Sequence, residues 1–197
     1  MLQQLSSLSL LLFLLLSLPS PLPSSATAKP QQDLVRSSCV HASYPNLCVR
    51  TLSSYGGPAS TPRDIALAAV KVSIARGRRV STYLATLSGL RSKRELAAVS
   101  DCVEQISDSV DELSKTLGEL KHLRVGKTFG WQMSNAQTWA SAALTDEDTC
   151  LDGFEDVESR VKADVKRKIR NLAKVTSNAL YMINRLDETR GRSKLNP

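Results

Sequence analysis

Four cysteines are the side chains of this chain that most readily react with one another. They stand at Cys39, Cys48, Cys102 and Cys150. An even number of cysteines in an oxidising compartment favours disulfides over free thiols. Zinc binding is a poorer alternative, because the sequence has no Cys-x-x-Cys pair and its histidines are far apart. Four cysteines allow three pairings. The short spacing from Cys39 to Cys48 favours a local bridge, which leaves Cys102 with Cys150, but the sequence alone does not decide.

Three carboxylates follow Cys102 at helical spacing. Glu104, Asp108 and Asp111 lie within about 60° of arc on a helix that turns by about 100° per residue. The centre of the apolar stripe on the same segment lies roughly 150° away, so the three acids should point off the core. They predict either a solvated helix face or a surface that binds a partner. The apolar stripe consists of Val103, Ile106, Val110 and Leu113.

The chain lacks the side-chain pattern of a hydrolytic enzyme. Neither of its histidines, His41 and His122, accompanies a serine or cysteine nucleophile in a recognisable turn. Carboxylates are plentiful, but we expect them on outward helix faces rather than in a pocket. The sequence therefore predicts a protein that is not an enzyme and that uses no cofactor and no metal.

The N-terminal segment predicts a secretory signal peptide. Residues 8–18 form an apolar run interrupted only by serine, shorter than the roughly 20 apolar residues of a membrane-spanning helix. The following Ala26-Thr27-Ala28 is a small-residue cleavage site, so the mature chain should begin at Lys29. An uncleaved signal anchor is the alternative. No charged residue precedes Lys29, so the mature protein keeps the whole net charge of +7.

The elements that must position these residues are predicted to be helices. Aromatic residues make up 5% of the chain and no segment alternates strictly between apolar and polar residues. Thr61 before Pro62, and Ser92 with Glu95, are helix start signals, and Gly191 is expected to end the last helix. Four bundle helices are expected: long ones at residues 62–87, 93–120 and 162–186, and a shorter one at 135–144.

Apolar residues recur every three or four positions along these segments, which is typical of a four-helix bundle. The core-facing stripes are expected to include Leu96 and Trp139, and Gly77 is expected to weaken its helix. Two short helical pieces, residues 31–39 and 46–54, come first and are each too short to be stable alone. The predicted fold is therefore an all-α four-helix bundle preceded by a short N-terminal helical hairpin tied by a disulfide.

Several segments, in this order and with this cysteine spacing, resemble the plant invertase and pectin methylesterase inhibitor family over nearly all of residues 35–187. The matching segments are Cys39 with Tyr44-Pro45-Asn46-Leu47-Cys48, then Asp101-Cys102-Val103-Glu104, then Ser109-Val110-Asp111-Glu112-Leu113, and Trp139 through Phe154.

The family contains two kinds of inhibitor. Those that bind acid invertase typically carry a Pro-Lys-Phe segment ahead of the fourth cysteine, whereas this chain has Gly126-Lys127-Thr128-Phe129 in that region. The segment at residues 141–145, which leads into Thr149 and Cys150, looks like the pectin methylesterase branch.

The resemblance implies a secreted inhibitor in the apoplast or cell wall, with residues 1–28 as signal peptide and 29–197 as inhibitor domain. Within that domain, residues 29–60 would form the hairpin and linker and 61–190 the bundle. The chain would act free-standing, covering the pectin-binding cleft of pectin methylesterase one-to-one and so regulating demethylesterification of homogalacturonan. The alternatives are an inhibitor of cell-wall or vacuolar acid invertase and a structural or signalling bundle without an enzyme target.

The resemblance also implies which residues meet the enzyme. Acids on the 93–120 helix contact the enzyme in this family, which assigns that role to Glu104, Asp108 and Asp111. Thr149 matches another contacting position.

A basic run on the last predicted helix has a different interpretation. Nucleic-acid binding is a poor match for a secreted chain whose run lacks aromatic residues for base stacking. A solvated helix face is the plainer interpretation, and weak attraction to acidic pectin is the alternative. The run consists of Lys162, Lys166, Arg167, Lys168, Arg170 and Lys174.

Overall fold

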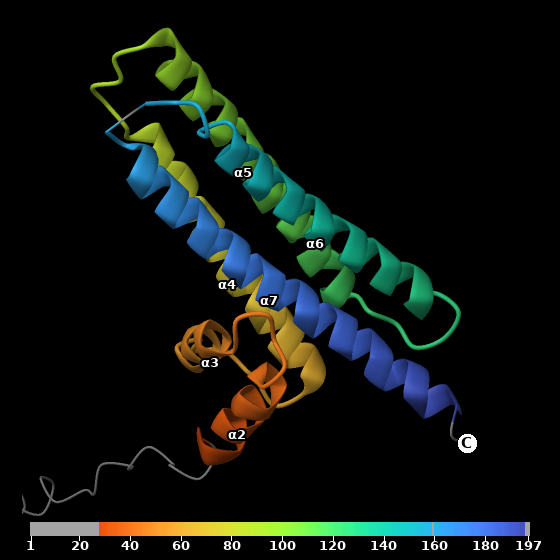
Figure 1. Cartoon of the computed structure of the whole chain (residues 1–197). Helices are drawn as coiled ribbons and strands as arrows, with labels where there is room; N and C mark the ends of the chain where they lie inside the picture. The colour runs from red at the N-terminus through yellow and green to blue at the C-terminus, as the bar shows by residue number, and fades with distance from the viewer. Residues whose placement is uncertain (1–27, 159, 196–197) are drawn as a thin grey trace, which may run out of the picture.

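The computed structural model describes residues 28–158 and 160–195, and that part of the chain is helical without strands (Figure 1). Nearly all of the predicted leader lies outside the described residues. The predicted all-α class, with its bundle and N-terminal hairpin, is confirmed. The helices are α2 (Ala28–Cys39), α3 (Pro45–Ser53), α4 (Pro62–Ala85), α5 (Lys93–Lys121), α6 (Phe129–Asp152) and α7 (Lys162–Leu195).

The four long helices form a bundle in which each packs against two others. Helix α4 lies against α5 and α7, and α6 lies against the same two helices. The pair α4–α7 therefore occupies one side of the bundle and the pair α5–α6 the opposite side. None of the described helices combines the length with the apolar composition that a membrane-spanning helix requires. The largest buried side chains of the core are Phe154, Ile65, Leu84, Ile106, Leu113, Leu120, Met133, Ile169, Leu172 and Ile183.

Two helices begin at the predicted caps. The Thr61 hydroxyl accepts a hydrogen bond from the Asp64 amide, and the Asp64 carboxylate accepts one from the Thr61 amide, which gives α4 a complete capping box. The Ser92 hydroxyl accepts from the Glu95 amide at 3.0 Å, while Glu95 accepts from the Arg91 amide at 2.7 Å. These bonds satisfy backbone donors that a helix start leaves without partners.

Two predicted helix bounds are wrong. The helix expected at 135–144 is α6, which starts at Phe129 and continues through the acidic segment to Asp152. Within this longer helix the middle acid of that segment, Glu147, turns into the core instead of facing water. Helix α7 passes Gly191 and runs to Leu195, so this glycine does not end it.

Three expectations about packing also need correction. Leu96 lies in the first turn of α5 and is 51% exposed, so it is not part of the core. Trp139 is only half-buried. Gly77 does not merely weaken α4: it is buried, and a Cβ atom there would lie 2.7 Å from Cγ2 of Val110 on α5. Glycine at this position lets the two helices approach closely.

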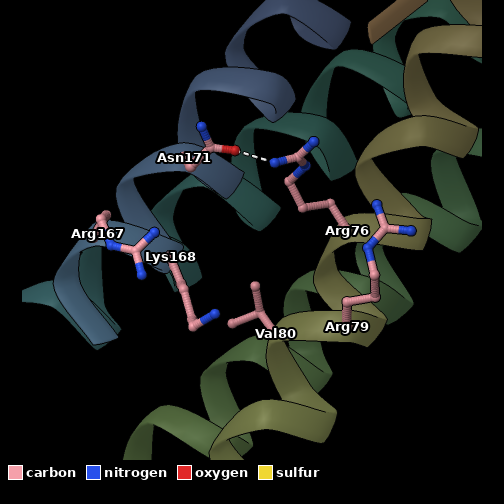
Figure 2. A pocket seen from close by; sticks show the side chains of 6 residues that line it. All are labelled: Arg76, Arg79, Val80, Arg167, Lys168 and Asn171. Atoms are coloured by element: carbon pink, nitrogen blue, oxygen red, sulfur yellow. Dashed lines mark hydrogen bonds between the residues drawn. The ribbon is translucent and has the colours of Figure 1, made fainter. Parts of the chain in front are cut away.

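The basic residues of α7 do not share one surface. Arg167 and Lys168 line a cleft against α4 (Figure 2). Arg170 and Lys174 instead line a hollow that also includes Asp148 of α6. The run is therefore divided between the α4 side and the α6 side of the helix.

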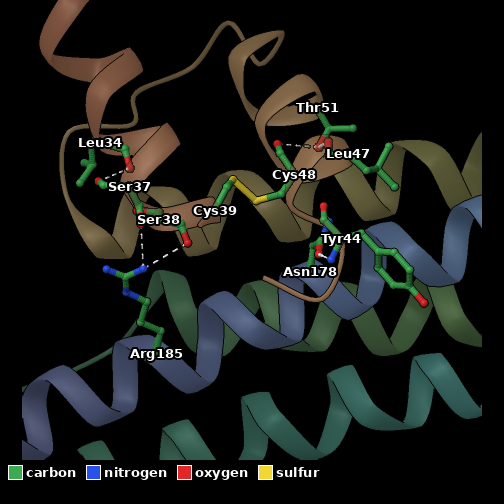
Figure 3. Close-up of a disulfide and its surroundings, with 10 residues drawn as sticks. All are labelled: Leu34, Ser37, Ser38, Cys39, Tyr44, Leu47, Cys48, Thr51, Asn178 and Arg185. Atoms are coloured by element: carbon green, nitrogen blue, oxygen red, sulfur yellow. Dashed lines mark hydrogen bonds between the residues drawn. A yellow bond between two sulfur atoms is a disulfide. The ribbon is translucent and has the colours of Figure 1, made fainter. Parts of the chain in front are cut away.

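The hairpin of α2 and α3 is held internally by the Cys39–Cys48 disulfide and externally by α7 (Figure 3). The Asn178 side chain accepts a hydrogen bond from the Tyr44 amide at 2.9 Å and donates one to the Tyr44 carbonyl at 3.1 Å. Arg185 donates to backbone carbonyls at the end of α2, each at 3.1 Å. Side chains of α7 thus fix the hairpin on the bundle.

Candidate partner-binding surface on α5 and α6

The second disulfide sets the register of the two helices that carry the predicted site. Cys102 on α5 and Cys150 on α6 are buried and bridged, with their Cα atoms 4.5 Å apart. Together with the Cys39–Cys48 bridge, this is the pairing favoured by the sequence. Glu104 and Thr149 each lie within two residues of a bridged cysteine and are both exposed. The bridge therefore brings two of the predicted site residues to the same level of the bundle.

The three predicted acids of α5 share an exposed face. Glu104, Asp108 and Asp111 are all solvent-exposed, whereas Ile106 and Leu113 between and beyond them are buried. This is the division between outer and inner face expected from the helical spacing. Their contact with an enzyme stays a prediction.

Two further carboxylates, Glu112 on α5 and Asp146 on α6, join this face, and sequence reasoning missed both. Burial raises the pKa of Asp146 on α6, and the nearby charges of Asp108 and Glu112 on α5 raise it further. A signal for Asp146 was available. The helices α5 and α6 are antiparallel, and the Cys102–Cys150 bridge joins them at known positions. Counting four residues back from Cys150 therefore places position 146 opposite the turn that precedes Asp108. The acidic surface thus extends from α5 onto α6.

A lysine and a tryptophan stand within this acidic surface. Lys115 Nζ lies 3.3 Å from Glu112 Oε1 and 4.5 Å from the centre of the Trp139 ring. The lysine charge also lowers the pKa of Asp146 in part, against the effect of the acids. The surface therefore combines carboxylates with one cation and one large aromatic ring, and of these side chains the aromatic ones are enriched at protein interfaces.

Thr149 lies exposed on α6 beside the bridged cysteine. Its hydroxyl donates a hydrogen bond to the Thr145 carbonyl at 2.7 Å. The hydroxyl proton is thus held by the helix, and the oxygen remains able to accept a hydrogen bond from a partner.

Beneath the surface, a carboxyl group ties three helices together. Glu147 on α6 is fully buried, and its Oε1 accepts hydrogen bonds from the hydroxyls of Ser109 on α5 and Thr176 on α7 at 2.8 and 2.9 Å. Burial raises the pKa of Glu147 to about 8, and the neighbouring charges of Asp146 and Asp148 act in the same direction. Three consecutive acids on one helix span about 200° of arc, which signals that one of them must turn inward.

Comparisons with known proteins agree with this architecture. A sequence model of the family described as "Plant invertase/pectin methylesterase inhibitor" matches residues 33–182. The chain is 60% identical to pectinesterase inhibitor 3 of Arabidopsis thaliana over 82% of both chains. It is 40% identical to pectinesterase inhibitor 9 of the same plant, over 92% of this chain and 95% of the relative. A 21 kDa protein of Daucus carota is 38% identical over 81% of this chain and 86% of the relative.

A solved structure shows the same fold. The crystal structure of a mutant form of a pectin methylesterase inhibitor from Arabidopsis superposes with a TM-score of 0.61 at 21% identity, covering 74% of this chain and 92% of that one. The prediction of a non-enzymatic chain fits a family described by its inhibitors. The family match over most of the sequence leads to one conclusion: the chain belongs to the plant invertase/pectin methylesterase inhibitor family.

Proposed function

We propose that this protein inhibits pectin methylesterase. The observation that carries the proposal is the high identity, over most of both chains, to a relative named pectinesterase inhibitor 3. The segment Gly126-Lys127-Thr128-Phe129, which replaces the Pro-Lys-Phe segment expected of invertase inhibitors, supports pectin methylesterase as the target. Its Phe129 is buried at the start of α6, so that ring is not presented for insertion into a sugar-binding site.

The proposed mode of action is obstruction of the pectin-binding cleft by the acidic surface of α5 and α6. Glu104, Asp108, Asp111 and Thr149 supply exposed polar groups on a rigid scaffold. Two covalently joined helices lose little conformational freedom on binding, which favours a tight complex. One inhibitor would cover one enzyme, without a cofactor. Demethylesterification of homogalacturonan would then stop, which limits the carboxylates available for calcium crosslinks.

The proposed site of action is the cell wall. The predicted signal peptide supports secretion into the apoplast, where the enzyme and its substrate meet. A net charge of +7 would also attract the inhibitor to acidic pectin, because oppositely charged surfaces raise each other's local concentration.

The proposal is tested by adding the purified mature protein separately to a pectin methylesterase and to an acid invertase. We expect ester hydrolysis to be inhibited stoichiometrically and sucrose hydrolysis to continue. Inhibition of invertase alone would replace the proposed target with the other enzyme of the family. Activity of both enzymes in the presence of folded protein would overturn the inhibitory function.

A further inference from the structure

Two adjoining clefts on the side of the bundle opposite to the acidic surface collect cationic side chains from three helices. One lies between α4 and α7 (Figure 2), and the other continues from it towards α3. Neither cleft is lined by Asp or Glu within the described part of the chain. The cationic residues that line them are Arg50 of α3, Arg76 and Arg79 of α4, and Arg167 and Lys168 of α7, and Asn171 of α7 lies among them.

The guanidinium at the junction of the clefts is only partly satisfied. Arg76 donates one hydrogen bond to the Asn171 side chain, while its Nε is buried and has no partner in the described structure. Burial lowers the pKa of Arg76, and the charges of Arg79 and Arg50 lower it further. Three guanidinium groups therefore gather here, and two of them, Arg50 and Arg79, disfavour the charge of Arg76. The described residues provide no ion pair for any of the three.

The cations at the far edge are held in place by other groups. Arg167 pairs with Asp164 one turn earlier in α7. Lys168 Nζ lies 4.3 Å from the centre of the Tyr83 ring, and the Tyr83 hydroxyl donates a hydrogen bond to Asp164. This edge is consequently ordered, and the uncompensated positive charge lies at Arg50, Arg76 and Arg79.

We propose that these clefts form a binding site for the carboxylates of an acidic polysaccharide, with a polyuronate chain lying across α3, α4 and α7. A guanidinium group matches a planar carboxylate with two parallel hydrogen bonds. Cations spread over three helices favour a polymer with repeated carboxylates over a single small anion. The choice of polyuronate rests on the proposed function, because pectin methylesterase releases such carboxylates from its substrate.

The site is tested by calorimetric titration of the mature protein with an unesterified oligogalacturonate and with its fully methyl-esterified counterpart. We expect the acidic oligomer to bind, its affinity to fall with added salt, and the ester to show no binding. The Arg50→Gln/Arg79→Gln variant should bind at least about tenfold more weakly, since two charge-assisted contacts are lost. Both side chains are exposed, so circular dichroism should show an unchanged fold.

The matched control is Lys121→Gln/Arg124→Gln, which removes the same charge from two exposed positions, one at the C-terminal end of α5 and one in the loop that follows it. We expect this variant to bind like the wild type. An equal loss of affinity in the two double variants would overturn the site and leave only attraction by net charge. Absence of binding to the acidic oligomer, or equal binding of the ester, would overturn it as well.

An inhibition assay on the same preparations separates the two proposals. Wild-type protein that inhibits the esterase but does not bind the oligomer would contradict the polyuronate site alone. Protein that binds the oligomer but does not inhibit would contradict the proposed function alone.

Discussion

The carboxyl group of Glu147 on α6 accepts a 2.8 Å hydrogen bond from the hydroxyl of Ser109 on α5, in a position where neither residue is exposed. Thr176 donates to the same oxygen, and the other carboxyl oxygen has no partner within the described residues. Ionising this group leaves a charge in the core with two hydrogen bonds and no cation. The folded protein therefore holds Glu147 in its neutral form.

Stability should fall as the pH rises from about 4.5 to about 8. The pKa of Glu147 is about 8 in the folded protein, against 4.5 for an ordinary glutamate. Between these values the folded state holds a proton that the unfolded state has released, so the free energy of unfolding decreases by up to about 1.4 kcal/mol per pH unit. Glu147→Gln should flatten this dependence and raise the stability at pH 8, measured by urea unfolding across that range.

A residual slope should survive in Glu147→Gln, because the pKa of Asp146 is also raised. The control Glu104→Gln alters an exposed carboxylate and should leave the wild-type profile in place. Identical profiles for the wild type and Glu147→Gln would show that the buried carboxyl does not govern the pH dependence.

Replacing Glu104, Asp108 and Asp111 together with their amides should weaken inhibition of pectin methylesterase. Exposed substitutions usually change stability by less than about 0.5 kcal/mol, so helicity and melting temperature should stay near wild type. The loss of binding free energy should be about 2–5 kcal/mol if the enzyme buries these charges against partners, and much less if they lie at a rim. The measurement is the inhibition constant.

Lys166→Ala and Lys174→Ala serve as controls for that experiment, because both lysines belong to α7 outside the proposed contact. Each should inhibit a soluble enzyme almost as well as wild type. Full inhibition by the folded triple variant would move the contact to Thr149 or to the hairpin.

Gly77→Ala should destabilise the protein by about 1–3 kcal/mol, the usual cost of overpacking a core. Its new methyl group would lie 2.7 Å from Val110 Cγ2, and Val110→Ala in the same chain should recover part of the loss. Gly118→Ala is the matched control, since a Cβ there meets nothing within 4 Å. That change should stabilise α5 by about 0.5–1 kcal/mol. Equal effects of both alanines on the melting temperature would contradict a close helix contact at Gly77.

Loss of the two disulfides should have unequal effects. The Cys102–Cys150 bridge closes a sequence separation of 48 and the Cys39–Cys48 bridge one of 9. The chain-entropy relation gives about 4 and about 2.5 kcal/mol for loops of these lengths. Paired Cys→Ala variants compared by urea unfolding test this order.

Peptide mapping without reduction tests the pairing, and a Cys48–Cys102 peptide from active protein would contradict it.

Local signals predicted the starts of α4 and α5 and most of the core. Thr61 and Ser92 act within one turn of their own positions, so neighbours in sequence suffice to identify them. The apolar period correctly predicted buried positions such as Ile106, Ile169 and Leu172. It failed at Leu96, because periodicity shows which face of a helix is apolar but not how far the neighbouring helices cover it.

Helical spacing predicted the candidate surface on α5 alone, and the family resemblance added only Thr149 on α6. The spacing of Glu104, Asp108 and Asp111 predicts one exposed face, because the residues belong to a single helix. Joining that face to Asp146 requires the register of α6 against α5, which the favoured Cys102–Cys150 bridge indicates, and the rotation of α6, which depends on tertiary packing. The inward turn of Glu147 likewise depends on hydroxyl groups supplied by two other helices.

The order of the helices around the bundle allows two occupants at once. A polymer lying along α4 and α7 leaves α5 and α6 uncovered, because the two pairs lie on opposite sides. An inhibitor tethered in this way would still present its carboxylates to an enzyme working on the same polymer. Their encounter would then depend on the effective concentration along one chain rather than on the bulk concentration of free inhibitor.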